Sequence, residues 1–243
     1  MKSPIRIAHA SDVHLDSDYF GGDDNRESCE AYRTVFSNLL DGIQAQNPDI
    51  FLLPGDLFDS NRASDETIRW SMEMLGALPF PVVMIPGNHD CLAENGVFRR
   101  YDFGALDNVT FLADPEGETA QLETPLVHLW GKGMIDHTPE FFPLQGLAPA
   151  KEGYWNLALG HGIYVGKDGN SYRSSPVSAK EIAESGYDYI ALGHHHALLD
   201  VSQNNTVAFY SGAPMPISSQ DKGTYLLTEL TEGENADVTI HTV

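Results

Sequence analysis

Side chains that can bind metal ions recur in five short segments, each directly after a stretch that reads as a buried strand. The segments are Asp12-Val13-His14, Gly55-Asp56, Gly87-Asn88-His89-Asp90, Gly160-His161 and Gly193-His194-His195-His196. Imidazole nitrogens and carboxylate or amide oxygens are ligands of divalent metal ions. Each segment alone fits an ordinary turn with a satisfied polar side chain. A shared metal site explains all five at once.

The positions of the five segments and the spacing within them predict that their polar side chains lie close together. Ligands of α/β sheets bind at the carboxyl ends of the strands, so the five loops are expected to meet in one crevice. Asp12 and His14 are two residues apart, and in extended backbone both point to the same side. His194 and His196 repeat this spacing. By the same alternation, His195 is expected to face elsewhere, outside the ligand set.

A set of ligands without a thiolate suits Mn²⁺, Fe or Zn²⁺. Two such ions, about 3.5–4 Å apart, can hold a hydroxide between them for in-line attack on phosphorus. Asn88 can offer its amide oxygen to a metal ion. The adjacent His89 is expected to face the substrate, where it can stabilise developing charge or protonate the departing oxygen. A centre of this kind is suited to the hydrolysis of phosphoesters.

The elements that must position these loops follow from apolar patterns. Short apolar runs alternate with helical patterns in the first half, which is typical of βαβ units and a mainly parallel sheet. Strands are expected at 5–10, 49–54, 81–85, 155–159 and 187–192, and antiparallel strands at 206–210, 223–230 and 237–242. Helices are expected at 27–46, after the cap Ser64, and between the capping box at Ser178 and the stop at Gly186. Some strands of a second sheet are expected between 112 and 153.

Length and charge set limits on the function. The 243 residues are expected to form one domain, 1–243. Only 14 Lys and Arg stand against 35 acidic residues, and the net charge of -21 repels polyphosphate partners at long range. The first residues, MKSPIRIAHASD, show no long apolar run, so neither a signal peptide nor a membrane span is expected. A cytoplasmic location is the default expectation.

The five segments resemble the pattern of the calcineurin-like metallophosphoesterases, which is D-x-H, G-D-x-x-D, G-N-H-D or G-N-H-E, G-H and G-H-x-H. All five motifs are present in order, from Asp12 to His196. The fuller strings SDVHLD, PGDLFDSNR, PGNHD, YDYIALGHHH and FYSGAPMPIS are similar to SbcD-type exonucleases of double-strand-break repair. The resemblance implies an α/β fold of the four-layer αββα sandwich type and a phosphoester substrate.

The resemblance also implies two divalent metal ions that share one aspartate. It assigns one ion to Asp12, His14, Asp56 and His196, and the other to Asp56, Asn88, His161 and His194. Mn²⁺ is the expected ion, with Fe or Zn²⁺ as alternatives.

Catalytic and substrate-binding residues are expected beside these ligands. The resemblance gives His89 the role of acid or charge stabiliser, and Asp59 resembles the family carboxylate that orients this histidine and raises its pKa. An ordinary turn residue is the alternative for Asp59. Arg62 and Arg173 flank the motifs and can contact phosphate. Solvated surface charge is the plainer account of both arginines.

Three functions compete at this point. One is a phosphodiesterase related to the repair nucleases, which acts on nucleic-acid ends; the acidic charge implies that a partner protein assists it. Another is a phosphodiesterase or phosphatase for a small molecule such as a nucleotide, which needs no basic track. The third is a metal-stabilised binding module without turnover. His89 argues against this third function, because a purely structural site needs ligands but no acid beside them.

Overall fold

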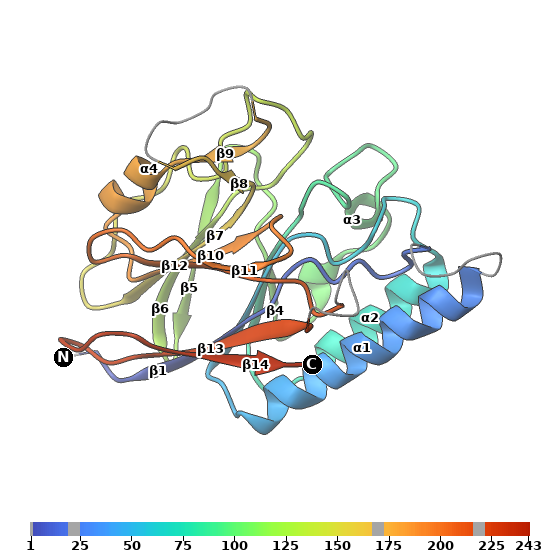
Figure 1. Ribbon diagram of the computed structural model, residues 1–243, viewed down its shortest axis with the longest axis horizontal. Helices are drawn as coiled ribbons and strands as arrows, with labels where there is room; N and C mark the ends of the chain where they lie inside the picture. Colours follow the sequence, from blue (N-terminus) through green and yellow to red (C-terminus); the bar gives the residue numbers. More distant parts are fainter. Residues whose placement is uncertain (1, 19–24, 167–172, 216–221) are drawn as a thin grey trace.

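Two six-stranded β-sheets, packed face to face, form the centre of the molecule (Figure 1). This is a computed structural model that describes residues 2–18, 25–166, 173–215 and 222–243. The helices lie on the outer faces of the two sheets.

The first sheet has the order β14-β13-β1-β2-β3-β4. Its four parallel strands are β1 (Ile5–His9), β2 (Ile50–Pro54), β3 (Val82–Ile85) and β4 (Val109–Phe111). The C-terminal strands β13 (Thr224–Leu230) and β14 (Asp237–Thr242) form an antiparallel hairpin, and β13 pairs antiparallel with β1. The strands predicted for the start and the end of the chain therefore form one sheet.

The second sheet has the order β11-β12-β10-β7-β6-β5. Its strands are β5 (Glu118–Glu123), β6 (Leu126–Gly131), β7 (Trp155–His161), β10 (Tyr189–Gly193), β11 (Leu198–Asp200) and β12 (Val207–Ser211). β12 was expected to be purely antiparallel, but it pairs parallel with β10. The reason is that β11 first reverses the chain, so that β12 re-enters the sheet in the direction of β10.

Two of the described helices, α2 and α4, begin at the capping residues that the sequence indicated. α1 (Asn25–Ala45) and α2 (Asp65–Gly76) cover the first sheet, and the N-cap Ser64 of α2 accepts a hydrogen bond from the backbone N–H of Thr67. α4 (Ala179–Glu184) covers the second sheet and begins with a complete capping box. Short helical turns, α3 (Val97–Arg100) and η1 (Phe103–Ala105), and the small pair β8 (Ile163–Tyr164) and β9 (Pro176–Val177) complete the described elements.

Three hydrophobic clusters separate four layers. Neighbouring residues of β2 show the division: Leu52 packs between the sheets, whereas Phe51 and Leu53 belong to the cluster beneath α1 and α2. In the same way, Ala191 of β10 packs between the sheets, and its neighbour Leu192 joins the outer cluster under α4. Alternation of side chains along a strand buries both faces of each sheet. The structure confirms the four-layer α/β sandwich.

The described helices include none with the length and apolarity needed to cross a membrane. The longest, α1, is amphipathic and presents Phe36, Leu39 and Ile43 to the first sheet.

Replacement of Leu39 by alanine tests the packing of α1. The side chain is fully buried, so Leu39→Ala is expected to lower the free energy of unfolding by about 2–5 kcal/mol, from lost burial and the cavity left behind. Gln44→Ala, at an exposed position of the same helix, should change it by less than about 0.5 kcal/mol. Urea denaturation of both variants measures the difference, and equal stability of the two variants would contradict the assigned core.

Candidate metal centre

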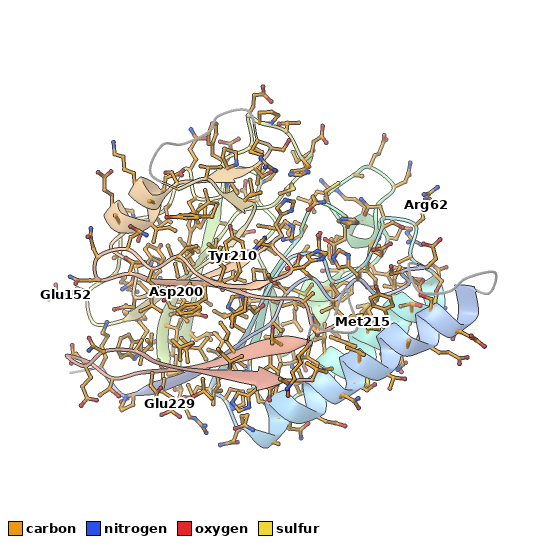
Figure 2. The ribbon with its side chains drawn as sticks, viewed as in Figure 1. Arg62, Glu152, Asp200, Tyr210, Met215 and Glu229 are labelled. Atoms are coloured by element: carbon orange, nitrogen blue, oxygen red, sulfur yellow. The ribbon has the colours of Figure 1, made fainter. Side chains whose placement is uncertain are left out.

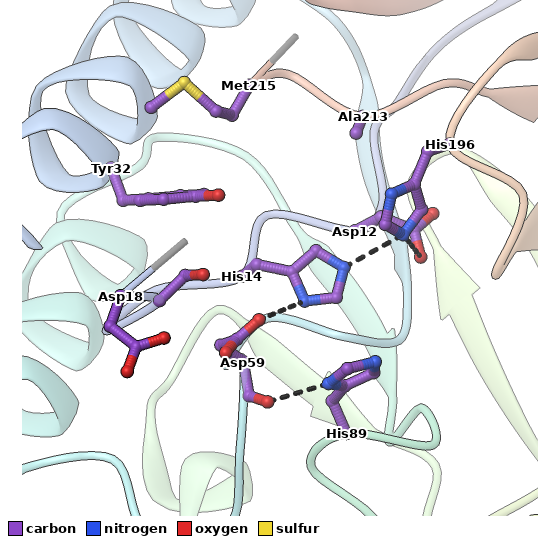
Figure 3. Close-up of a pocket in the computed structure, with 10 residues that line it drawn as sticks. Asp12, His14, Asp18, Tyr32, Asp59, His89, His196, Ala213 and Met215 are labelled. Atoms are coloured by element: carbon purple, nitrogen blue, oxygen red, sulfur yellow. Dashed lines mark hydrogen bonds and ion pairs between the residues drawn. The ribbon is translucent and has the colours of Figure 1, made fainter. Parts of the chain in front are cut away.

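The five polar segments converge where the carboxyl ends of both sheets meet. The first sheet contributes the loops after β1, β2 and β3, and the second contributes those after β7 and β10. Backbone hydrogen bonds join the loops: the N–H of Asp12 donates to the carbonyl of Gly55, and the N–H of Gly162 donates to that of Gly193. The crevice expected from strand order is present, and Figure 3 shows part of it.

One group of potential ligand atoms comes from Asp12, His14 and His196. The Nε2 atoms of His14 and His196 lie 3.1 Å apart, and Nε2 of His196 lies 3.8 Å from Oδ1 of Asp12 (Figure 3). Asp56 approaches the same group, with its Oδ2 atom 4.0 Å from Nε2 of His14. These four residues are the ones that the family resemblance assigned to the first ion.

The second group lies on the other side of Asp56. Oδ1 of Asn88 lies 2.9 Å from Nε2 of His161 and 2.8 Å from Nδ1 of His194. Nε2 of His161 is also 3.3 Å from Oδ2 of Asp56. The structure therefore brings together all seven residues that the sequence proposed as ligands.

The spacing of these atoms fits divalent ions. Bonds of about 2.0–2.2 Å from nitrogen or oxygen to a metal ion place neighbouring ligand atoms about 3–3.5 Å apart. The contacts among Asp56, Asn88, His161 and His194 fall close to this range. Each contact joins a ring nitrogen to an oxygen and requires a proton, which a cation can replace on binding. The donor set and its geometry fit metal ions.

The backbone of four expected ligands adopts left-handed conformations. The φ angles are 58° at Asp12, 55° at His14, 53° at Asp56 and 96° at His194. The expectation that Asp12 and His14 lie in extended backbone is therefore wrong, although both side chains still reach the same site. Such conformations cost about 1–3 kcal/mol each and persist where surrounding contacts enforce them. This concentration of strain marks the loops as functional.

Neighbouring hydrogen bonds fix the orientation of individual ligands. Nδ1 of His161 lies 2.9 Å from the carbonyl oxygen of Pro54. Since a carbonyl only accepts, Nδ1 carries the proton and Nε2 faces Asp56 and Asn88. The Asp12 carboxylate accepts hydrogen bonds from the hydroxyl of Ser11 and the backbone N–H of His194. Partners of this kind typically orient metal ligands.

The charge of Asp56 and the pKa values of the neighbouring histidines depend on each other. Burial alone would raise the pKa of Asp56, but His161, His14 and His89 outweigh it and hold this pKa well below its usual range. Burial lowers the pKa of His161, yet Asp56 and Asp12 raise it to about 9. A buried carboxylate thus keeps a proton on an adjacent histidine, as expected of a cluster that attracts cations.

His89 and Asp59 lie beside this cluster. Nδ1 of His89 is 2.7 Å from the backbone carbonyl oxygen of Asp59, so this nitrogen donates, and the other ring nitrogen lies on the far side of the ring (Figure 3). The Asp59 carboxylate lies 3.2 Å from Nδ1 of His14. The carboxylate was expected to orient His89, but in this structure the main chain of Asp59 contacts His89 and its side chain contacts His14.

A cavity of about 300 Å³ opens beside these groups. Its described lining comprises Asp12, His14, Ser17, Asp18, Tyr32, Asp59, His89, His196, Ala213 and Met215. A substrate in this cavity would reach one ligand group and His89 together.

Comparison with known proteins identifies the family. Residues 5–198, which include every motif, match the calcineurin-like phosphoesterase family. The chain belongs to this family. It is therefore a phosphoester hydrolase, and members of the family typically bind two divalent metal ions. A solved crystal structure with 14% sequence identity is similar over 99% of both chains, with a TM-score of 0.62, which supports the fold alone.

The two arginines of the phosphoesterase lie outside the cavity lining. Arg62 is exposed at the periphery (Figure 2) and lines a neighbouring hollow of about 530 Å³. Arg173 is exposed and follows directly after the undescribed residues 167–172. Neither is among the described residues that line the 300 Å³ cavity. A direct role in substrate binding stays a prediction for both.

Asp90 is a positioning residue whose role the sequence motif did not reveal. Its buried carboxylate accepts hydrogen bonds from the N–H of Gly87, at 2.7 Å, and of Phe58, at 3.1 Å. Burial and the charge of Asp56 raise the pKa of Asp90 to about 6, although the two N–H groups oppose this. Asp90 thereby ties the loop that carries Asn88 to the loop after β2.

His137 is a second residue that the sequence left without a role. Its ring centroid lies 5.0 Å from that of His194, so the loop between β6 and β7 also packs against the metal centre. No motif surrounds His137, and the contact joins residues far apart in the sequence. Only the fold reveals this neighbour.

The amount of bound metal in two variants can distinguish the expected ligand His196 from the neighbouring His195. His196→Ala is expected to lower the content of bound Mn²⁺ and abolish most hydrolytic activity, because it removes a nitrogen from the group with Asp12 and His14. His195→Ala is the matched control, since the His195 ring packs 5.5 Å from the ring of Tyr210. Elemental analysis after dialysis measures the bound metal. Full metal content in His196→Ala would contradict its assignment as a ligand.

Removal of the Asp90 carboxylate tests the link between the loops. Asp90→Ala leaves two buried N–H groups without an acceptor, at about 1–3 kcal/mol each, so the unfolding free energy should fall by about 2–6 kcal/mol. Metal affinity should fall as well. Glu94→Ala removes an exposed carboxylate nearby and serves as control. Wild-type stability and metal affinity of Asp90→Ala, measured by urea denaturation and calorimetry, would refute this role.

Proposed function

We propose that this protein hydrolyses phosphodiesters with two divalent metal ions that share Asp56. The observation that carries the proposal is the position of the Asp56 carboxylate between the two groups of potential ligands. Oδ2 lies 3.3 Å from Nε2 of His161 on one side and 4.0 Å from Nε2 of His14 on the other. The nitrogen and oxygen donors favour Mn²⁺, with Fe or Zn²⁺ as alternatives.

The metal ions and the side chains around them would have different roles in such a reaction. Two divalent ions would lower the pKa of a water molecule, so that it can attack phosphorus, and would neutralise charge on phosphoryl oxygens. His89 keeps Nδ1–H on the Asp59 carbonyl, which leaves Nε2 to exchange a proton with the substrate. A protonated His89 can stabilise the transition state or protonate the departing oxygen. The main-chain carbonyl of Asp59 holds His89 in place, and the Asp59 carboxylate contacts His14, an expected ligand.

The charge distribution favours a small diester over a polymeric nucleic acid. The described lining of the cavity contains no Lys or Arg, and the chain carries a net charge of -21. Non-specific affinity for DNA comes mainly from Lys and Arg that displace counterions from phosphates. Nucleic-acid ends remain the second candidate, because the strings around the site resemble SbcD-type exonucleases; such activity would depend on a partner protein.

The Pro216–Ser218 end of the string FYSGAPMPIS lies outside the described residues. Its described part supports the site. The backbone N–H of Ala213 donates to the carbonyl of His196, and the Ser211 hydroxyl lies 3.2 Å from that of Ser11. This segment shapes one wall of the cavity and supplies no ligand to the proposed centre.

A panel of substrates tests the proposed reaction. With added Mn²⁺, bis-p-nitrophenyl phosphate is expected to be hydrolysed faster than p-nitrophenyl phosphate, and the panel also includes cyclic nucleotides and single- and double-stranded DNA. Duplex binding should be weak at physiological salt without a partner. Submicromolar duplex binding under these conditions would place the nuclease function ahead. Failure to hydrolyse any diester would refute the proposal.

Substitution of His89 separates catalysis from metal binding. His89→Asn is expected to lower turnover by about 10²–10⁴ while the metal content stays near that of the wild type, because a positioned acid or charge stabiliser is lost. His195→Asn is the control, because it changes a neighbouring histidine outside the ligand set. Steady-state kinetics and elemental analysis on the same preparations give both quantities. If His89→Asn lost metal as well, His89 would be reassigned as a ligand.

A further inference from the structure

The cavity beside the metal centre has two walls of different chemistry. One wall carries Asp12, His14 and His196 from the ligand loops. The opposite wall is formed by Tyr32 of α1 and by Met215, which follows β12. Figure 3 shows these two side chains across the cavity from His14, whereas Ala213 lies beside His196. We call Tyr32 and Met215 the apolar wall.

The apolar wall is anchored in the protein core. Tyr32 is only 6% exposed and belongs to the hydrophobic cluster that holds α1 against the first sheet. Met215 packs against the same cluster. In Figure 3 the ring of Tyr32 lies between Met215 and Asp18, with its hydroxyl end pointing toward His14. An aromatic ring held in this way loses little conformational freedom when a ligand packs against it.

The polar groups near this wall disfavour additional negative charge on a ligand. Asp18 and Asp59 are the carboxylates that line the cavity beyond Asp12, and the described lining contains no Lys or Arg to balance them. A second phosphate beside Asp18 would therefore meet like charge. An uncharged flat group would instead gain contact with the aromatic ring and the polarizable thioether.

From these observations we infer that the apolar wall binds an uncharged aromatic group of the substrate. The substrate class is then a phosphoester that carries one aryl or heteroaryl group, such as a nucleoside, with no further phosphate on that group. This inference rests on the proposed function for the placement of the phosphoryl group at the metal centre. Tyr32 and Met215 are the residues that determine this specificity.

Two phosphonates with the same anionic group test the inference without turnover. Calorimetry of the Mn²⁺-loaded protein is expected to show that phenylphosphonate binds about tenfold or more tightly than methylphosphonate, as typical for stacking on an aromatic side chain. Tyr32→Ala should remove about tenfold of this preference. Tyr32→Phe should retain it, because the ring and not the hydroxyl makes the contact.

Additional variants keep the test decisive. Met215→Ala should also reduce the preference, and it tests the same wall if Tyr32→Ala fails to fold; Gln44→Ala, on the distant end of α1, should leave the preference unchanged. Equal affinity of the wild type for both phosphonates, or an unchanged preference in Met215→Ala and every folded Tyr32→Ala preparation, would overturn the inference. The inference would also be overturned if neither phosphonate bound to the wild type.

Hydrolysis of bis-p-nitrophenyl phosphate, measured on the same preparations, distinguishes the two proposals. A preference for phenylphosphonate without any hydrolysis would refute the proposed function and support the apolar wall. Hydrolysis without such a preference would refute the apolar wall alone.

Discussion

The carboxylate of Asp56 is 1% exposed at the junction of the two sheets, and the surrounding structure has to satisfy its charge. An unpaired carboxylate at this depth would cost several kcal/mol. The backbone N–H of His89 donates to Oδ1 at 2.8 Å, and His161 approaches Oδ2 at 3.3 Å. Because these partners come from β3 and β7, the charge of Asp56 requires the ends of both sheets to stay together. The four-layer sandwich and the metal centre therefore depend on each other.

Close approach of the loops depends on two glycines. A Cβ atom at Gly193 would clash with the carbonyl oxygen of Pro54 in the opposite sheet, and one at Gly87 would clash with Asp56. Any side chain at these positions would push the sheet ends apart and widen the contacts among the ligands. The glycines of the sequence motifs thus serve the geometry of the centre, while the histidines and aspartates serve its chemistry.

Much of this arrangement could be predicted from the sequence, because local rules decide it. Helix α1 was expected at 27–46 and lies at Asn25–Ala45, since its apolar stripe and the Asn47-Pro48 stop define it. The seven expected ligands meet because the carboxyl ends of parallel strands share one edge. The left-handed backbone at Asp12 and His14 could not be predicted, since contacts with the loop after β2 impose it.

The partners of the expected catalytic side chains could not be predicted from the sequence either. Asp59 and His89 are 30 residues apart, and the sequence does not reveal that His89 contacts the main-chain carbonyl of Asp59 and not its carboxylate. The carboxylate is then left for His14. The same limit applies to His137 and Tyr32, which carry no motif and reach the site only through the packing of their elements.

The negative charge of the chain and the proposed binding of two metal ions together determine how an anionic substrate can approach the site. Without metal ions, Asp12, Asp56 and Asp59 oppose the approach of an anionic phosphoryl group. Two divalent ions would outweigh the carboxylates among their ligands and reverse the local sign. Phosphoester binding should then be conditional on metal binding, and the part of the substrate distant from the ions would still meet acidic surroundings. Under this constraint, contact with Tyr32 and Met215 would add affinity for an uncharged aromatic group, in line with the inferred role of the apolar wall.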